Sequence, residues 1–373
     1  MLFNKLVSLF RFFICFLLLQ VSGLPYAAGA EKSNITARIH FNTQTANFQR
    51  AREFYHLLGY TQGVSDFPKT NTHAMARSLG MYDLCTYQIE AIELMSIPNS
   101  LGPTSIDLIQ FNKPFNGEPP YPDLNHLGLA YAALGTSSFE ADYNYLQGQG
   151  VDFLSEPFGD KGKRFAFMQD PDGVYLKLLE NSNPSNSGNG ALTGINSMPY
   201  IGINVSDFSE SLKFYRSLGY TNIKMLPERS SLGEAAAFGL DRPFTIRGAD
   251  ISLANGDGHT LRLVQWLEPF NSEPPYPPPI NHIGIHRIAL AVLNLDSAVT
   301  SLSVQGVEFL SEIAPCCSGT GLDEMGIINA IDPDGIFVEL VGPITQKAPQ
   351  SAPAACGDDI LGGTTTLNIG SIL

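Results

Sequence analysis

The sequence predicts an α+β fold of four βαβββ modules that form two tandem domains, each a cupped, mixed β-sheet. Two observations support this prediction. Five sequence matches recur in the same order in two halves of the chain, and within each half a strand–helix–strand pattern occurs twice. An ordered series of matches with drifting offsets indicates a duplicated unit with loop insertions.

The five matches extend over most of both halves. FYHLLGYT at Phe54 recurs as FYRSLGYT at Phe214, and FNGEPPYP at Phe115 recurs as FNSEPPYP at Phe270. The other pairs are NHLG at 125 with NHIG at 281, QGVDFLSE at 149 with QGVEFLSE at 305, and DPDG at both 170 and 332. We therefore expect a first domain at 34–180, a flexible Asn-, Ser- and Gly-rich linker at 181–197, and a second domain at 198–342.

The elements of the second half show the module pattern in order. The alternating run at 201–205 predicts a half-buried strand, and the apolar spacing at 206–219 predicts a helix that ends at a glycine. A strand at 261–266 closes this module. The next module repeats the pattern with a strand at 288–292, a helix at 295–305 and a closing strand at 336–341. Its DPDG segment suits the tight turn before that last strand.

The two ends of the chain predict segments outside the domains. Lys5 and Arg11 precede an apolar run at 12–21, and Ala28-Gly29-Ala30 follows as a small-residue cleavage site, so residues 1–30 predict a signal peptide. An uncleaved anchor is the alternative, although the run is shorter than the roughly 20 residues that a span needs. We expect a secreted or periplasmic chain with no membrane span after cleavage, and a low-complexity tail at 343–373.

The composition excludes one class of partner. The chain has 22 Lys and Arg against 36 Asp and Glu, for a net charge of −14, whereas nucleic-acid binding needs clustered basic residues. Phosphate loops, nucleophile elbows and dinucleotide fingerprints are absent from the sequence. Four cysteines follow the signal, but their spacing dictates no pairing and matches no zinc pattern. A small molecule is therefore the expected partner, and the sequence does not indicate the oligomeric state.

Four βαβββ modules in two similar domains resemble the vicinal oxygen chelate superfamily, which includes glyoxalase I, extradiol dioxygenases and bleomycin-resistance proteins. The resemblance covers residues 34–342 and is carried by the FYHLLGY and FYRSLGY segments, the QGVDFLSE and QGVEFLSE segments, and the closing DPDGVYLKLLE and DPDGIFVELVG strands. It implies that two modules curl into a cup around a divalent metal. Each module would contribute one ligand from its first strand and one from its last. Because the superfamily includes lyases, dioxygenases and metal-free binders, the fold does not determine the reaction.

Transferring these ligand positions to the present sequence gives a mixed set. In module order the pairs are His40 with Asp107, Tyr131 with Lys177, Tyr200 with Arg262, and Arg287 with Glu339. His40 and Asp107 are metal-competent and Glu339 is a ligand of the superfamily's type, whereas lysine and arginine carry no acceptor. The matching His126 and His282 are expected to bond loop carbonyls instead.

Two ways of pairing the modules predict different sites. If neighbouring modules pair, as the loose linker favours, neither cup has a full ligand set. The chain would then bind a small oxygenated or anionic organic molecule through Tyr131, Lys177, Tyr200, Arg262 and Arg287, with no resident metal. If the first module pairs with the fourth, three potential ligands meet and could hold Fe²⁺, Mn²⁺ or Zn²⁺, with Arg287 as an anion clamp.

Three classes of function therefore stay open. The first is an exported, glyoxalase-like binding protein. The second is a metal-dependent lyase or dioxygenase-like enzyme that uses His40, Asp107 and Glu339, with His40 and Asp107 as its catalytic groups. The third is a non-catalytic scaffold for a partner, in which side chains fill both cups.

Overall fold

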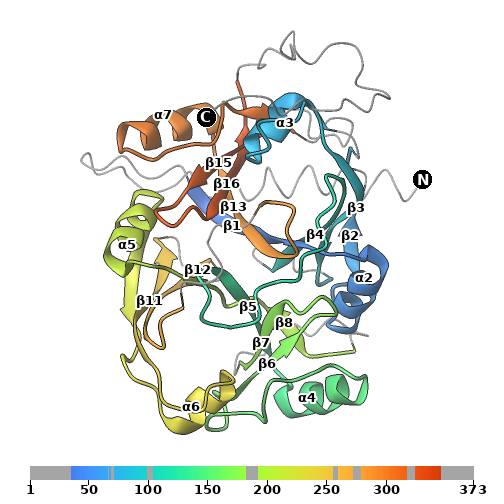
Figure 1. The fold of residues 1–373 in the computed structure, drawn as a ribbon, viewed down its shortest axis with the longest axis vertical. Coiled ribbons are helices and arrows are strands. Elements are labelled where there is room, and N and C mark those ends of the chain that lie inside the picture. The colour runs from blue at the N-terminus through green and yellow to red at the C-terminus, as the bar shows by residue number, and fades with distance from the viewer. Residues whose placement is uncertain are drawn as a thin grey trace, which may run out of the picture.

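The computed structural model describes residues 35–65, 67–68, 71–98, 104–181, 192–254, 259–271, 279–316 and 324–345. The predicted signal peptide and most of the predicted linker and tail lie outside these residues. Two eight-stranded sheets account for the strands (Figure 1), which confirms the predicted fold class. No helix in the described ranges is long and apolar enough to cross a bilayer.

The elements follow the four modules in chain order. The first module contains β1 (Ile35–Gln44), α2 (Phe48–Leu57), β2 (Gln62–Val64), α3 (His73–Ser78), β3 (Gln88–Ser96) and β4 (Ser105–Lys113). The second contains β5 (Gly128–Thr136), α4 (Phe139–Gly148), β6 (Phe165–Gln169) and β7 (Tyr175–Glu180). The third contains β8 (Ile195–Ser197), β9 (Tyr200–Asn204), α5 (Phe208–Ser217), β10 (Tyr220–Met225), α6 (Leu232–Ala237), β11 (Thr245–Leu253) and β12 (Thr260–Glu268). The fourth contains β13 (Gly284–Val292), α7 (Leu295–Val304), β14 (Ala314–Pro315), β15 (Met325–Ile331) and β16 (Phe337–Pro343).

Each sheet combines one module from each half of the chain. Sheet A has the order β14-β15-β16-β13-β1-β4-β3-β2, and sheet B has the order β10-β11-β12-β9-β5-β7-β6 with β8 beside β5. The strands that join the modules are antiparallel pairs, β1 with β13 and β5 with β9. The expectation that the first module shares a cup with the second, and the third with the fourth, is therefore wrong. The first module pairs with the fourth, and the second with the third.

The connections explain this pairing. The predicted linker joins β7 to β8 and β9 within sheet B, and its last residues form β8 instead of a flexible segment. The chain crosses from sheet A to sheet B after β4, in a loop that contains Pro114, Pro119 and Pro120. Proline-rich segments are extended and semi-rigid, so this loop is suited to span the distance. The chain returns to sheet A after β12.

The alternation of side chains along the strands gives each sheet two different faces. On one face, Leu108, Leu178, Leu263 and Leu340 are fully buried in a core shared by both sheets and the helices. Their chain neighbours point to the opposite face, because successive side chains alternate in a strand. That opposite face is the inner wall of a cup, called cup A in sheet A and cup B in sheet B.

Short-range sequence signals fix where the helices that pack against these sheets begin and end. The side chain of Asn47 accepts a hydrogen bond from Arg50 N and caps α2, while Asp207 accepts from two backbone N–H groups and caps α5. Both helices end before a glycine with positive φ, Gly59 at 101° and Gly219 at 96°. These are the two FYxxLGY segments, so the repeat fixes the start and end of both helices.

Candidate functional site

Four ionisable side chains meet on the inner wall of cup A. His40 comes from β1, Asp107 from β4, Arg287 from β13 and Glu339 from β16. Arg287 Nε lies 3.3 Å from Glu339 Oε2, and Arg287 Nη2 lies 4.0 Å from Asp107 Oδ2. His40 Nε2 lies 3.8 Å from the same Glu339 oxygen. The structure therefore gathers the set that pairing of the first and fourth modules requires.

The two carboxyl groups of this cluster differ in their electrostatic surroundings. Burial raises the pKa of Asp107, although His40 and Arg287 oppose the shift. Burial alone would also raise the pKa of Glu339, but Arg287 and His40 hold it below its usual value. Arg287 and Glu339 therefore form a buried ion pair, and Asp107 takes up a proton more readily than an exposed aspartate does.

Several polar atoms of cup A are buried without a hydrogen-bond partner in the described part of the chain. They are both ring nitrogens of His40, Oδ1 of Asp107 and Nη1 of Arg287. The other Asp107 oxygen accepts a hydrogen bond from Asn42 Nδ2 at 2.5 Å. A buried polar atom without a partner is costly and needs an explanation. Here the unpaired atoms include both donors and acceptors, and they lie in one cluster.

A divalent metal is the group that the resemblance to the superfamily implies for cup A. His40, Asp107 and Glu339 are suitable in chemistry, but no group of three or more His, Cys, Asp or Glu side chains in the described ranges is arranged to hold an ion. The guanidinium of Arg287 occupies the position of the fourth ligand and contacts both carboxyl groups. Its positive charge compensates them as a metal would and repels a second cation. The arrangement does not fit a metal.

Apolar side chains close over cup A. Helix α3, strands β3 and β4 and the loops beside them contribute a buried cluster of Ala76, Leu79, Tyr87, Ile89, Ile109, Phe111 and Ile280. Burial raises the pKa of Tyr87, which lies within the electrostatic reach of Arg287, Glu339 and Asp107. The ionisable cluster is therefore shielded from water by α3 and by a protonated phenol.

Cup B holds the four remaining predicted site residues, Tyr131, Lys177, Tyr200 and Arg262. Arg262 is held by a bidentate pair with Asp250, at 2.7 and 2.9 Å, and donates to Tyr200 Oη at 2.9 Å. Asp250 faces Arg262 across β11 and β12. The guanidinium of Arg262 is thus already satisfied within the protein.

Lys177 lies deeper in cup B and is only 4% exposed. Its Nζ lies 3.7 Å from the ring centroid of Phe165 and 5.1 Å from that of Phe167. Burial lowers the pKa of Lys177 well below its usual value, and the charge of Arg262 lowers it further. The amine is therefore in an aromatic, water-poor environment beside another cation.

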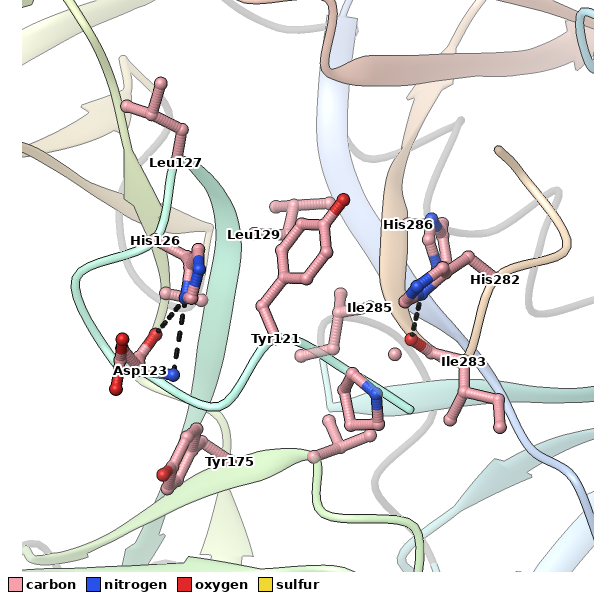
Figure 2. A pocket seen from close by; sticks show the side chains of 14 residues that line it. Tyr121, Asp123, His126, Leu127, Leu129, Tyr175, His282, Ile283, Ile285 and His286 are labelled. Carbon is pink, nitrogen blue, oxygen red and sulfur yellow. Dashed lines mark hydrogen bonds between the residues drawn. The ribbon is translucent and has the colours of Figure 1, made fainter. Parts of the chain in front are cut away.

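Two cavities lie outside the ionisable clusters. The larger, about 430 Å³, is at the mouth of cup B and is lined in part by Leu154, Tyr175, Phe238 and Trp266. The smaller, about 50 Å³, is at the junction of the two halves and is shown in Figure 2. Neither is lined by the ionisable residues of cup A.

The junction cavity contains the repeated histidines (Figure 2). The ring of Tyr121 lies between His126 and His282, at centroid distances of 4.8 and 5.3 Å. His126 Nδ1 lies 3.1 Å from Asp123 O, and His282 Nδ1 lies 2.8 Å from Ile283 O. Both histidines therefore bond loop carbonyls, as predicted.

Sequence reasoning missed several residues that shape the two cups. Asp250 was detectable in principle, because it is an acid in an apolar strand and faces Arg262 across a strand pair. Tyr87 and Phe238 gave no such signal, since they follow α3 and α6, helices of only six residues. Cys85 is disulfide-bonded. No spacing in the sequence indicated that bond.

The chain was compared with known proteins. The sequence profile of the Glyoxalase/Bleomycin resistance protein/Dioxygenase superfamily matches residues 197–340. The chain is similar to the lactoylglutathione lyase of Schizosaccharomyces pombe, with 23% identity over 216 residues that cover 57% of this chain and 66% of the relative. The match thus spans slightly less than two thirds of that relative.

Solved structures share the architecture. Glyoxalase I from Zea mays superposes with a TM-score of 0.51 at 16% identity, over 82% of this chain and 92% of that chain. A candidate dioxygenase from Bacillus subtilis has a TM-score of 0.54 at 10% identity, over 84% of this chain and 86% of that chain. At such identities these structures show the fold alone. Residues 197–340 thus match the glyoxalase/bleomycin resistance/dioxygenase superfamily by profile, and the fold of the described chain is that of this superfamily, the vicinal oxygen chelate group.

Proposed function

We propose that cup A binds a small, oxygen-bearing organic molecule without the help of a resident metal. The cluster of unpaired buried atoms on His40, Asp107 and Arg287 carries this proposal. Arg287 Nη1 is a permanent donor, and Asp107 Oδ1 is an acceptor when it is ionised. A ligand with neighbouring oxygens, one accepting and one donating, would satisfy both atoms.

The chemistry of Arg287 favours a carboxylate or a polarised carbonyl in this ligand. A guanidinium presents its N–H groups in a rigid fork that matches planar oxygen pairs. Arg287 uses Nε and Nη2 toward the two acids, so Nη1 is the group left for a ligand. His40 lies beside it, with no hydrogen bond to either ring nitrogen among the described residues, and is placed to hold a proton from a ligand hydroxyl.

The proposal is tested by thermal shift with two probes, lactate and pyruvate, which both carry a carboxylate beside a second oxygen. The expected result is a concentration-dependent rise in Tm for the wild-type chain that is lost in Arg287→Met. Arg262→Met is the matched control, since it removes the corresponding arginine of cup B. No rise with either probe would contradict the proposal and favour the scaffold alternative, in which α3 and α6 fill the cups.

A metal-dependent lyase is the second candidate, because His40, Asp107 and Glu339 do share one wall and a curated relative is named lactoylglutathione lyase. For this function Arg287 would have to withdraw from both acids. Metal content measured on protein purified without chelators, before and after His40→Ala, separates the candidates. A stoichiometric metal that is lost in His40→Ala would contradict metal-free binding.

We also propose that the protein acts outside the cytoplasm. The basic start, the apolar run at 12–21 and the Ala28-Gly29-Ala30 site support export. The disulfide at Cys85 supports it independently, because such bonds persist in oxidising compartments. N-terminal sequencing of the protein recovered from its host, with an expected start at Glu31, tests this proposal. An intact N-terminus in the cytoplasmic fraction would contradict it.

A further inference from the structure

Lys177 is a buried amine that the proposed function of cup A does not use. It lies on β7, on the inner wall of cup B, and only 4% of it is exposed. Within the described residues its Nζ has no hydrogen bond and no carboxylate within 4.0 Å, although a buried ammonium is normally paired. The position therefore calls for a role other than an ion pair.

Aromatic rings surround this amine. The centroids of Phe165, Phe167, Phe238 and Tyr131 lie 3.7, 5.1, 5.3 and 6.0 Å from Nζ. These rings replace most of the water around the nitrogen, since only 4% of Lys177 is exposed. Their faces attract an ammonium, but this attraction replaces only part of the hydration that the charge loses on burial.

The charged groups around cup B also disfavour the ammonium form. Arg262 on β12 opposes the charge, whereas Glu234 on α6 and Asp250 on β11 support it only at a distance. Both carboxylate oxygens of Asp250 already accept a hydrogen bond from Arg262. The phenols of Tyr131 and Tyr200 are protonated, because burial raises the pKa of each. A lysine that is desolvated and next to another cation is the usual arrangement for a nucleophilic amine.

A cavity shares the Phe238 side chain with the aromatic rings around this amine. The cavity of about 430 Å³ at the mouth of cup B is lined by Phe238, the same residue whose ring covers Nζ. Leu154, Leu240 and Trp266 give the cavity an apolar wall, while Asn125 and Asn271 supply amide groups. The cavity is large enough for a small organic molecule, and Phe238 both lines it and lies with its ring centroid 5.3 Å from Nζ.

We propose that Lys177 is a nucleophilic amine that forms a Schiff base with a carbonyl compound entering cup B past Phe238. The Nζ lone pair attacks the carbonyl carbon, and the carbonyl oxygen takes up the proton that the nitrogen loses. Loss of one water from this carbinolamine leaves a C=N bond. The step needs no oxidant, reductant or metal. The cavity lining points to an aldehyde or ketone with an apolar or aromatic body. This inference does not depend on ligand binding in cup A.

The experiment uses benzaldehyde as the probe and sodium cyanoborohydride to reduce any imine to a stable benzylamine. The full folded chain is treated at pH 6, and benzylated lysines are located by peptide mass spectrometry. Lys177 should react at least about tenfold faster than the exposed Lys161 and Lys213, because each unit by which a pKa is lowered raises the neutral fraction tenfold. In denaturant the three lysines should react alike.

Two variants sharpen the test. Phe238→Ala should speed labelling of Lys177, since it removes a ring that both lines the cavity and lies beside Nζ. Phe115→Ala truncates an exposed ring elsewhere and should leave the rate unchanged. Lys177→Arg should lose only this label. Labelling of Lys177 in the native wild-type chain at or below the rate of Lys161 would overturn the proposal, and that comparison needs no variant.

Discussion

Arg287 determines what cup A can hold. It stands on the first strand of its module, at the position where the superfamily places a metal ligand, and reaches both Asp107 and Glu339. A guanidinium and a metal ion would occupy the same negative site. Arg287 therefore competes with a metal ion for the two carboxyl groups of cup A.

The first prediction is that replacing Arg287 allows cup A to bind a metal. Arg287→His removes the competing cation and adds an imidazole to His40, Asp107 and Glu339, so the variant should bind Zn²⁺ at least about tenfold more tightly than the wild-type chain, or about 1.4 kcal/mol. Equilibrium dialysis followed by elemental analysis measures the difference. Arg262→His in cup B is the control and should gain nothing. Equal zinc content in Arg287→His and wild-type protein would show that Arg287 does not block a metal.

Two buried aspartates make stability depend on pH. Burial raises the pKa of Asp170 to about 7, against an ordinary value of about 4, and the matching Asp332 behaves the same way. Tyr55 donates to Asp170 at 3.1 Å, and Tyr215 donates to Asp332 at 3.3 Å. Below about pH 4 both carboxyl groups are protonated in the folded and the unfolded chain. As the pH rises, the unfolded chain ionises first, so the folded state loses stability between about pH 4 and pH 7.

The second prediction follows from this loss of stability with rising pH. In the double variant Asp170→Asn, Asp332→Asn the free energy of unfolding should fall less between pH 5 and pH 7 than it does in the wild-type chain. Urea unfolding at the two pH values measures it. Asp241→Asn, which changes an exposed acid remote from both aspartates, is the control and should keep the wild-type slope. Parallel curves for the double variant and the wild-type chain would contradict the raised pKa values.

At the scale of elements, the two loops that cross between the sheets, after β4 and after β12, are hydrogen-bonded to each other. Asn125 Nδ2 donates to Pro269 O at 3.1 Å, and Asn281 Nδ2 donates to Pro114 O at 3.0 Å. Each asparagine lies near the end of one crossing loop and donates its hydrogen bond to the start of the other loop. The two NH(L/I)G segments of the repeat therefore link sheet A to sheet B at two equivalent points.

The third prediction concerns these links. Asn125→Ala and Asn281→Ala should each lower the free energy of unfolding by about 1 kcal/mol, since each leaves a loop carbonyl without its donor. The two losses should add, because the substitutions act on separate bonds. Chemical denaturation measures them, with Asn116→Ala as the control, which removes only a bond within its own loop. Losses below about 0.3 kcal/mol would show that the links contribute nothing to stability.

Local elements were predictable where their signals lie within a short stretch of sequence. The predicted strand at 201–205 is β9, and the predicted helices at 206–219 and 295–305 are α5 and α7. Helices α3 and α6 were not predicted, because six residues give too little periodicity to recognise. They matter for the site nevertheless, since each closes one cup.

At the scale of the whole molecule, the inner-wall positions were predictable but their grouping was not. Alternation along each strand places Asp107, Lys177, Arg262 and Glu339 on inner walls once the closing strands are identified. Which modules share a wall depends on whether β1 pairs with β5 or with β13. Both partners have similar patterns, so only the paths of the connections decide.

The fourth prediction tests this pairing. A chain of residues 34–180 keeps the first and second modules but lacks β13 and β9, so β1 and β5 each have an unpaired edge. Exposed edges recruit other strands, and the core shared by both sheets would be cut in half. This half should therefore associate with itself instead of folding as a monomer, and should form a one-to-one complex with 181–345 when the two are co-expressed. Size-exclusion chromatography with light scattering measures the masses. A folded, monomeric half chain would mean that neighbouring modules can close a sheet between themselves, because only that pairing leaves neither edge open.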